Sequence, residues 1–329
     1  MTLNLRGSMV ALVMPFRNDQ LDESALKRLI EFHVASGTSA LVPCGTTGES
    51  ATLSFDEHDR VVDLTVQAAK GRIPVIAGTG SNNTREAIRL TKHAKEAGAD
   101  GALLISPYYN KPTQQGLYLH FQAVAEAVDM PIVVYNIASR TAVNIEPETF
   151  ARLTSIKNIV AVKESSGNLE QMSRILQLTK GKLTLLCGDD ALTLPVLAIG
   201  GTGVISVAAN IVPRDVAAMV SAFDAGKRQE ALQWHQRLLP LFKALFLETN
   251  PIPIKTAMGM LGMIEPELRL PLCEMSEGNV VRLKAALEDH GLFNAATGNP
   301  SMTLGTGRPP RPADHDRRGG HATRRVKAS

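Results

Sequence analysis

Short runs of apolar residues alternate along the chain with longer amphipathic stretches. Eight of the apolar runs are continuous, which is typical of strands that are covered on both faces. They occupy residues 8–15, 39–45, 73–80, 101–109, 131–136, 158–164, 183–190 and 202–210. Strands of this kind, separated by helical stretches, predict an α/β protein with a parallel sheet.

The stretches between the strands carry signals for the start of a helix. Residues 54–70 and 83–98 show helical patterns of apolar and polar positions. We expect Ser54 and Thr84 to cap the starts of these two helices. Glu57 follows Ser54 by three residues, the spacing of a capping box, in which each side chain bonds the other residue's backbone N–H.

Eight strand–helix units at this spacing predict a (β/α)8 TIM barrel, a fold of ~250 residues. A doubly wound open sheet is the alternative, because strand–helix alternation by itself does not close a barrel. Further helical stretches follow at residues 213–248 and 280–293. We therefore expect a catalytic barrel over residues 1–225, a helical C-terminal extension over 226–293 and a tail over 294–329.

Positive charge is concentrated in the predicted tail. The 329 residues carry a net charge of +3, and residues 294–329 contribute seven Arg or Lys against two Asp. Subtracting this tail charge of +5 leaves −2 for residues 1–293. The tail also contains nine Gly or Pro and no hydrophobic periodicity, so we expect it to be disordered.

Cysteine usage and hydropathy narrow the class of protein. The three cysteines, at positions 44, 187 and 273, are too few and too scattered for a disulfide framework or a zinc cluster. We therefore expect reduced thiols and no metal site. No N-terminal segment has the plan of a signal peptide, and no apolar run approaches the ~20 residues that span a bilayer. The sequence predicts a cytoplasmic protein without a membrane partner.

One predicted strand ends on a lysine, Lys163, directly after an apolar run. In the simpler interpretation its ammonium group lies in water, because lysine is rarely fully buried. In the alternative, a dry pocket favours the neutral amine, which is a nucleophile. Other predicted strands end near Thr46, Thr47, Tyr109 and Tyr135, and active sites of TIM barrels lie at these strand ends. This shared location favours a catalytic lysine.

Each of these polar segments also has a purely structural interpretation. Residues 45–50, Gly-Thr-Thr-Gly-Glu-Ser, could form a simple turn, although their hydroxyl and backbone N–H groups suit a small carboxylate. They lack the spacing of the nucleotide-binding glycine motifs. Tyr135 could be a packed aromatic residue, and Tyr109 beside Tyr108 could belong to an interface. Trp234 lies in a helical stripe and is expected in the core.

Six segments in this order form a recognisable set. They are GTTGES (45–50), PYYNKP (107–112), YNIASR (135–140), VAVKESSGN (160–168), GDD (188–190) and GVISVAAN (203–210). From about residue 5 to residue 293, the chain resembles the dihydrodipicolinate synthase family, within the class I aldolase superfamily of N-acetylneuraminate lyase. The resemblance implies a lyase that condenses pyruvate with L-aspartate 4-semialdehyde to 4-hydroxy-tetrahydrodipicolinate, the first committed step towards diaminopimelate and lysine.

The resemblance also implies catalytic roles for four residues. Lys163 would form a Schiff base with the keto carbon of pyruvate, and the resulting enamine would attack the aldehyde. Tyr135 would act as the general acid and base. Thr46 would link Tyr135 to Tyr109 in a proton relay, with Tyr109 reaching into the site of a neighbouring subunit. No cofactor is implied.

Four further residues would bind the substrates. Thr47 would hold the pyruvate carboxylate, and Arg140 would receive the carboxylate of the semialdehyde through its planar fork of donors. Gly188 and the carbonyl group of Ile205 would line the pocket near Lys163. The resemblance further implies a homo-oligomer, a tetramer built as a dimer of dimers.

In lysine-sensitive members of the family, L-lysine inhibits from a site at the dimer interface. The matching positions here are Ser50, Ala51, Leu53, His58, Asn82, Glu86 and Tyr108. Phe55 stands where the sensitive pattern has histidine, and phenylalanine cannot make the hydrogen bonds of an imidazole. We therefore expect weakened rather than absent inhibition.

Three positions depart from the usual family sequence. Ala138 replaces a proline and Ala142 replaces a glycine in the segment that carries Arg140, so we expect a looser loop there. Met14 replaces a threonine near the first strand. The departures at Ala138 and Ala142 concern the second substrate rather than the imine chemistry, and Met14 removes a hydroxyl group.

Two other functions compete with the synthase activity that the resemblance implies. Another pyruvate aldolase, such as a sialic acid lyase or a keto-deoxy sugar acid aldolase, would also use Lys163 and Tyr135. Arg140 together with Thr46 and Thr47 favours the synthase. A non-catalytic barrel whose basic tail contacts nucleic acid is the other rival. The presence of Lys163, Tyr135 and Thr46 argues against it, so no nucleic-acid partner is expected.

Overall fold

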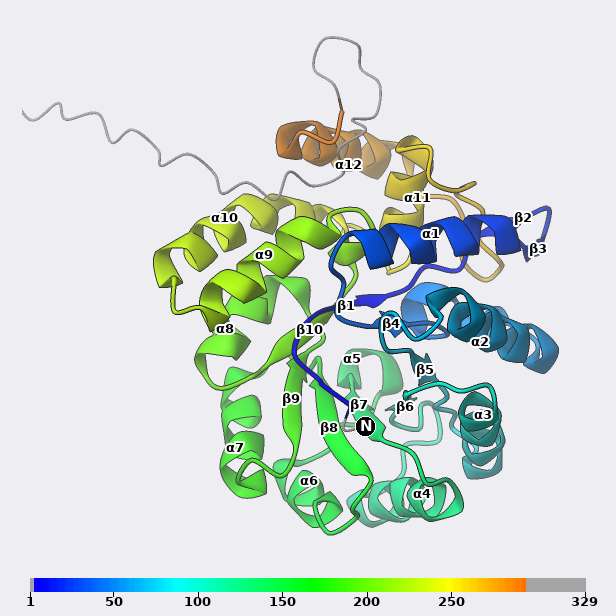
Figure 1. The fold of residues 1–329 in the computed structure, drawn as a ribbon, viewed down its shortest axis with the longest axis vertical. Coiled ribbons are helices and arrows are strands. Elements are labelled where there is room, and N and C mark those ends of the chain that lie inside the picture. Colours follow the sequence, from blue (N-terminus) through cyan, green and yellow to red (C-terminus); the bar gives the residue numbers. More distant parts are fainter. Residues whose placement is uncertain (1–2, 294–329) are drawn as a thin grey trace, which may run out of the picture.

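The computed structural model describes residues 3–293 and contains a closed barrel of eight parallel strands (Figure 1). Around the sheet the strands follow the order β4-β1-β10-β9-β8-β7-β6-β5, and a bridge between Leu41 and Val75 joins its two edges. The predicted TIM barrel is thus confirmed, and the open sheet is excluded. The strands are β1 (Gly7–Ala11), β4 (Leu41–Val42), β5 (Ile76–Gly78), β6 (Gly101–Ile105), β7 (Ile132–Asn136), β8 (Ile159–Glu164), β9 (Thr184–Cys187) and β10 (Gly203–Ser206).

Helices form the outer layer and follow the strands along the chain, as the ribbon shows (Figure 1). The outer helices are α1 (Glu23–Ala35), α2 (Phe55–Ala69), α3 (Thr84–Glu96), α4 (Gln114–Ala127), α6 (Pro147–Leu153), α7 (Leu169–Thr179), α8 (Thr193–Ala198) and α9 (Pro213–Asp224). The short helix α5 (Ala138–Thr141) lies in the loop after β7, inside this ring. A short hairpin, β2 (Phe16–Arg17) with β3 (Gln20–Leu21), was not predicted from the sequence.

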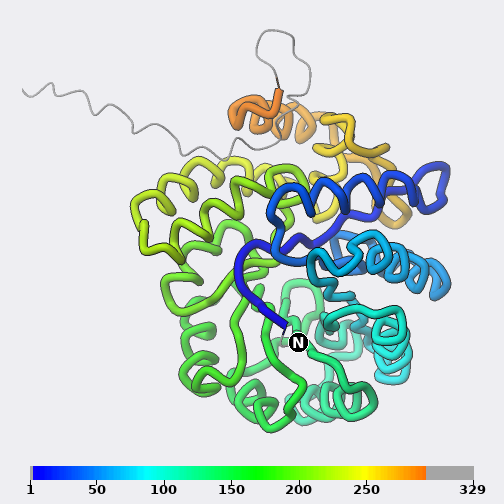
Figure 2. The backbone as a smooth tube through the Cα atoms, in the orientation of Figure 1, coloured from blue at the N-terminus to red at the C-terminus, as the bar shows by residue number. Residues whose placement is uncertain are grey.

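The strands are continuous in apolar residues because both of their faces are buried. Residues such as Val133 and Ala161 point into the barrel, whereas Val134 and Val162 pack against the helices. The N-terminal segment crosses the barrel in the tube view, and Leu5 packs within the interior cluster (Figure 2). This segment thus covers the apolar interior at the N-terminal ends of the strands, opposite the loops that follow them.

The helix caps agree with the sequence in one case and differ in the other. Ser54 and Glu57 form the predicted capping box at the start of α2. The expectation that Thr84 caps α3 is wrong, because Asn83 is the cap and Thr84 is the first helical residue. The Thr84 hydroxyl instead lies 2.9 Å from Nδ1 of His120, so it is engaged elsewhere.

Three helices follow the barrel: α10 (Arg228–Ala244), α11 (Ile252–Met260) and α12 (Glu277–His290). The hydrophobic pattern predicted the first and the last, and Trp234 of α10 is fully buried as expected. Helix α11 was missed, because Pro251 and Pro253 interrupt its sequence and resemble a loop signal.

The proposed domain boundary at residue 225 stays a prediction. The tail at residues 294–329 lies outside the described residues, and so does the disorder expected for it. Within residues 3–293, no helix is both long enough and apolar enough to cross a membrane.

Candidate active site

Lys163 lies near the carboxyl end of β8 and is almost completely buried, with 6 % of its surface exposed. It pairs in register with Tyr135 on β7, and both side chains belong to the inward-facing set of their strands. The Lys163 Nζ atom lies 4.1 Å from the centre of the Tyr135 ring. The structure therefore buries the amine in a pocket, away from bulk water.

A cavity of about 50 Å³ opens beside these two residues at the C-terminal end of the barrel. A second cavity, of about 40 Å³, adjoins it and shares Thr46 and Tyr135. The first brings together six of the eight residues predicted to act in catalysis or substrate binding: Lys163, Tyr135, Thr46, Thr47, Arg140 and Gly188.

Gly188 leaves the space that the Lys163 side chain occupies. A Cβ atom at position 188 would lie 2.8 Å from Cε of Lys163 and 1.9 Å from Oγ of Ser165. Both distances are shorter than van der Waals contact, so a larger residue would displace the lysine. This position therefore shapes the pocket through its lack of a side chain.

The described chain contains a second buried lysine, and the two differ in their partners. Lys255 on α11 is fully buried and forms an ion pair with Glu49. Burial lowers the pKa of Lys255, while the neighbouring Glu49 carboxylate acts in the opposite direction. No carboxylate within residues 3–293 forms an ion pair with Lys163. Lys163 is thus the buried lysine whose amine is not committed to an anion.

Thr47 and Arg140 are connected through a residue that the sequence did not single out. Thr47 lies in the 3-10 turn η1 (Thr46–Gly48), and its Oγ1 accepts a hydrogen bond of 3.0 Å from Nδ2 of Asn250. Arg140 Nη2 donates to the backbone carbonyl of Asn250 at 3.0 Å. Asn250 and Phe246 both line the cavity. The Asn-Pro pair at 250–251 was the only sequence signal, and it indicated merely a turn.

The loop that carries Arg140 forms a short helix, α5, in spite of its departures from the family pattern. Ala142 ends this helix with a φ of 59°, so the position does require a left-handed backbone. Alanine is less favourable than glycine in this conformation by roughly 1 kcal/mol. The Ala142 N–H nevertheless donates to the carbonyl of Ala138 at 2.9 Å, which closes the turn. Met14 is buried beside Gly48.

Two predicted site residues do not join the cavity. Tyr109 is 88 % exposed, and its φ of 71° is positive. Its predicted link to Thr46 is therefore not formed within one chain. The Ile205 side chain packs in the barrel interior, and Val207 forms the cavity wall that follows the same strand. The role of the Ile205 carbonyl stays a prediction.

The residues expected to bind L-lysine lie in loops and helix starts at the same end of the barrel. Ser50 lines the 40 Å³ cavity, and His58 is buried with its Nε2 atom 2.8 Å from the carbonyl oxygen of Gly78. The carboxylate of Glu86 accepts hydrogen bonds from Ser81 and Asn83. The remaining members of the set are Ala51, Leu53, Asn82 and Tyr108.

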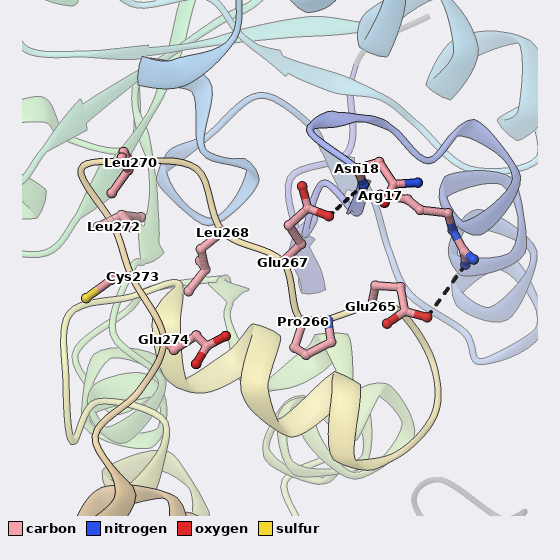
Figure 3. A pocket seen from close by; sticks show the side chains of 10 residues that line it. All are labelled: Arg17, Asn18, Glu265, Pro266, Glu267, Leu268, Leu270, Leu272, Cys273 and Glu274. Atoms are coloured by element: carbon pink, nitrogen blue, oxygen red, sulfur yellow. Dashed lines mark hydrogen bonds and ion pairs between the residues drawn. The ribbon is translucent and has the colours of Figure 1, made fainter.

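A larger cavity, of about 590 Å³, lies elsewhere, between the β2–β3 hairpin and the segment 265–274 (Figure 3). None of the predicted catalytic or substrate-binding residues lines it. Size alone therefore does not identify the candidate active site, which we locate instead at the buried Lys163 amine and the hydroxyl groups around it.

Comparisons with known proteins agree with this geometry. Residues 4–290 match the sequence pattern of the Dihydrodipicolinate synthetase family. The 4-hydroxy-tetrahydrodipicolinate synthase of Geotalea daltonii is 56% identical over 288 residues, which cover 88% of this chain and 99% of the relative. The crystal structure of dihydrodipicolinate synthase from Aquifex aeolicus superposes with a TM-score of 0.87 at 54% identity, covering 88% of this chain and 99% of that one.

Two further solved structures, less similar in sequence, concern lysine binding and oligomeric state. One is dihydrodipicolinate synthase from Cyanidioschyzon merolae with lysine bound, 42% identical over 88% of this chain and 99% of that one, with a TM-score of 0.85. The other is described as a monomeric dihydrodipicolinate synthase variant, 43% identical over 88% of this chain and 97% of that one, with a TM-score of 0.86. On sequence and structure together, this chain belongs to the dihydrodipicolinate synthetase family.

Proposed function

We propose that this protein is a 4-hydroxy-tetrahydrodipicolinate synthase, a lyase that condenses pyruvate with L-aspartate 4-semialdehyde. The observation that carries the proposal is the buried Lys163 amine, which faces the Tyr135 ring in a small cavity and forms no ion pair with a carboxylate of residues 3–293. Arg140 and Thr47 lie at the same cavity, where they provide donors for two carboxylates. High identity to named synthases over nearly their full length supports the same function.

In the proposed reaction Lys163 supplies the nucleophile and Tyr135 transfers protons. The Lys163 amine attacks the keto carbon of pyruvate, and loss of water leaves an iminium ion. The iminium acidifies the neighbouring methyl group, which loses a proton to give an enamine. The enamine carbon then bonds to the aldehyde carbon of the semialdehyde while Tyr135 transfers protons. Attack by the semialdehyde's own amino group closes the ring and releases Lys163.

The proposed role of Arg140 separates the synthase from other pyruvate aldolases. Its guanidinium lines the cavity and donates to Asn250, so it is held at the point where a second substrate would enter. The purified protein should form the condensation product from pyruvate and L-aspartate 4-semialdehyde, detected by mass spectrometry. Cleavage of N-acetylneuraminate at a higher kcat/KM than this condensation would instead indicate a sialic acid lyase.

We further propose that the active protein is an oligomer in which Tyr109 completes the site of a neighbouring subunit. Tyr109 is exposed in a backbone conformation with positive φ, and the adjacent Tyr108 is also exposed. Such a pair of exposed aromatic residues in a loop suits a protein interface. A dimer of dimers is the expected assembly.

Replacement of Tyr109 by phenylalanine tests this shared site. We expect kcat to fall by about tenfold or more, because a proton relay loses its hydroxyl group. Sedimentation should show an unchanged oligomer, since the ring remains. Tyr108→Phe serves as the neighbouring control and should keep kcat near that of the wild type. A wild-type protein that is fully active as a monomer at assay concentration would contradict the shared site.

We also propose that L-lysine binds at this interface and inhibits only weakly. Phe55 is 49 % exposed, and the guanidinium of Arg89 lies 4.9 Å from its ring centre. Because this residue is phenylalanine, it has no imidazole nitrogen that could form a hydrogen bond with a ligand. Loss of one hydrogen bond typically costs ~0.5–1.5 kcal/mol, or roughly a threefold to tenfold change in affinity.

Phe55→His is therefore expected to strengthen inhibition by roughly threefold to tenfold. Initial rates and calorimetric heats should be measured against increasing L-lysine, with D-lysine as the stereochemical control. Complete inhibition of the unmodified protein at micromolar lysine would show that Phe55 is harmless. No heat at millimolar lysine would show that the site does not bind.

A further inference from the structure

The ion pair between Glu49 and Lys255 is buried and lies directly behind the turn that carries Thr46 and Thr47. The side chains of the pair are 1% and 0% exposed, respectively. The Lys255 Nζ atom also lies 4.3 Å from the centre of the Phe16 ring. Glu49 and Lys255 are 206 residues apart, so their contact joins the barrel to the helix α11 of the C-terminal extension.

Glu49 itself has an unusual backbone conformation. Its φ of 49° and ψ of 39° are left-handed, a region that residues with a side chain adopt at a cost. Its N–H donates to the carbonyl of Thr46, and its own carbonyl accepts from the N–H of Thr52. The geometry of the Thr46–Gly48 turn therefore depends on Glu49 keeping this conformation, and the buried carboxylate is the part of Glu49 that is fixed from outside the turn.

The carboxylate has a second fixed partner. Its other oxygen accepts a hydrogen bond of 3.1 Å from the backbone N–H of Arg269. Arg269 belongs to the segment 265–274, which is tied to the β2–β3 hairpin by Glu267 and by the ion pair of Glu265 with Arg17 (Figure 3). Glu49 is thus held between α11 and this segment.

The extension also reaches the turn at a second point. Asn250, which lies just before α11, donates to the hydroxyl of Thr47 at 3.0 Å. One link runs from Lys255 of α11 to Glu49, which closes the turn, and the other runs from Asn250, just before α11, to Thr47. A buried ion pair is weak evidence for a purely stabilising role, because apolar residues of similar volume often replace such pairs without loss of stability.

We propose that the Glu49–Lys255 pair is a positioning device that holds the Thr46–Thr47 turn in the geometry that binds the carboxylate of pyruvate. The proposal rests on the function proposed above. Glu49 and Lys255 touch no reacting atom and act through the turn. Loosening the pair should therefore weaken pyruvate binding more than it slows the chemical steps.

The experiment compares three variants: Lys255→Met, Glu49→Gln and the double variant with both changes. Each single variant leaves one buried charge without its partner and should lower Tm. In the double variant no charge remains unpaired, so Tm should return close to that of the wild type. In the double variant we expect the pyruvate concentration for half-maximal borohydride trapping at Lys163 to rise by about tenfold. This is the typical effect of losing one hydrogen bond, here between the turn and the pyruvate carboxylate. The maximal extent of trapping should not change.

Leu153→Ala provides a control matched for stability. Leu153 is fully buried in α6, which packs against α4 and α7, so its truncation should lower Tm without altering the half-maximal pyruvate concentration. If the double variant recovers both Tm and the wild-type pyruvate concentration, the pair serves only stability and the proposal is overturned. If the wild-type protein shows no trapping at Lys163, the proposed function fails instead, so the two failures are distinguishable.

Discussion

Replacement of Lys163 by alanine is expected to abolish both imine formation and turnover. In the wild-type protein, sodium borohydride with pyruvate should reduce the imine and add a pyruvyl-derived group to this one residue. In Lys163→Ala the adduct should be absent, and kcat should fall by roughly three orders of magnitude or more, because no other nucleophile can form the intermediate. Peptide mass mapping of the adduct and steady-state assays measure the two effects.

The control for this experiment is a lysine outside the cavity. Lys157 is exposed, so Lys157→Ala should keep both the adduct and the activity. Lys255 is a more demanding comparison, because it is the other buried lysine of residues 3–293 but is paired with Glu49. A wild-type adduct on Lys255, or on any residue other than Lys163, would contradict the assignment of the nucleophile.

The second large effect is expected for Tyr135→Phe. The phenylalanine ring can keep the packing against Lys163, whose Nζ lies 4.1 Å from the ring centre, so the variant removes mainly the hydroxyl group. A positioned acid or base typically contributes 10²–10⁴-fold, and we expect kcat to fall by about that factor. The rate of borohydride trapping should fall as well, because imine formation also requires proton transfer.

Tyr118→Phe is the matched control for this variant. Tyr118 lies on α4, half-buried beneath the guanidinium of Arg152, and is remote from the cavity. Loss of its hydroxyl should leave kcat unchanged. If Tyr135→Phe retained most of its activity at all pH values, another group would have to move the protons and Tyr135 would be a packing residue only.

The sequence by itself determined the eight strands and the set of residues at their carboxyl ends. Strands covered on both faces need apolar residues at nearly every position, so each appears as an unbroken run that is easy to recognise. Lys163 and Tyr135 follow from the same pattern, because they are polar groups at the ends of such runs. Their roles came from the resemblance to a family and not from the pattern.

Only the tertiary structure decided which contacts join residues distant in the chain. Closure of the barrel through Leu41 and Val75 depends on the accumulated twist and tilt of all eight strands, which local periodicity does not encode. Helix α11 was hidden because its prolines give the signal of a loop, although proline in the first turn of a helix costs little.

The candidate site also depends on contacts between residues that are distant in the chain. Asn250 joins Thr47 to Arg140, and Glu49 joins Lys255 to the turn, across 203 and 206 residues of chain. Nothing in the linear sequence distinguishes a lysine that will meet a carboxylate in the core from one that will not. Among the described residues, folding brings Glu49 to Lys255 and no carboxylate to Lys163, and this difference in partners separates a structural lysine from the proposed nucleophile.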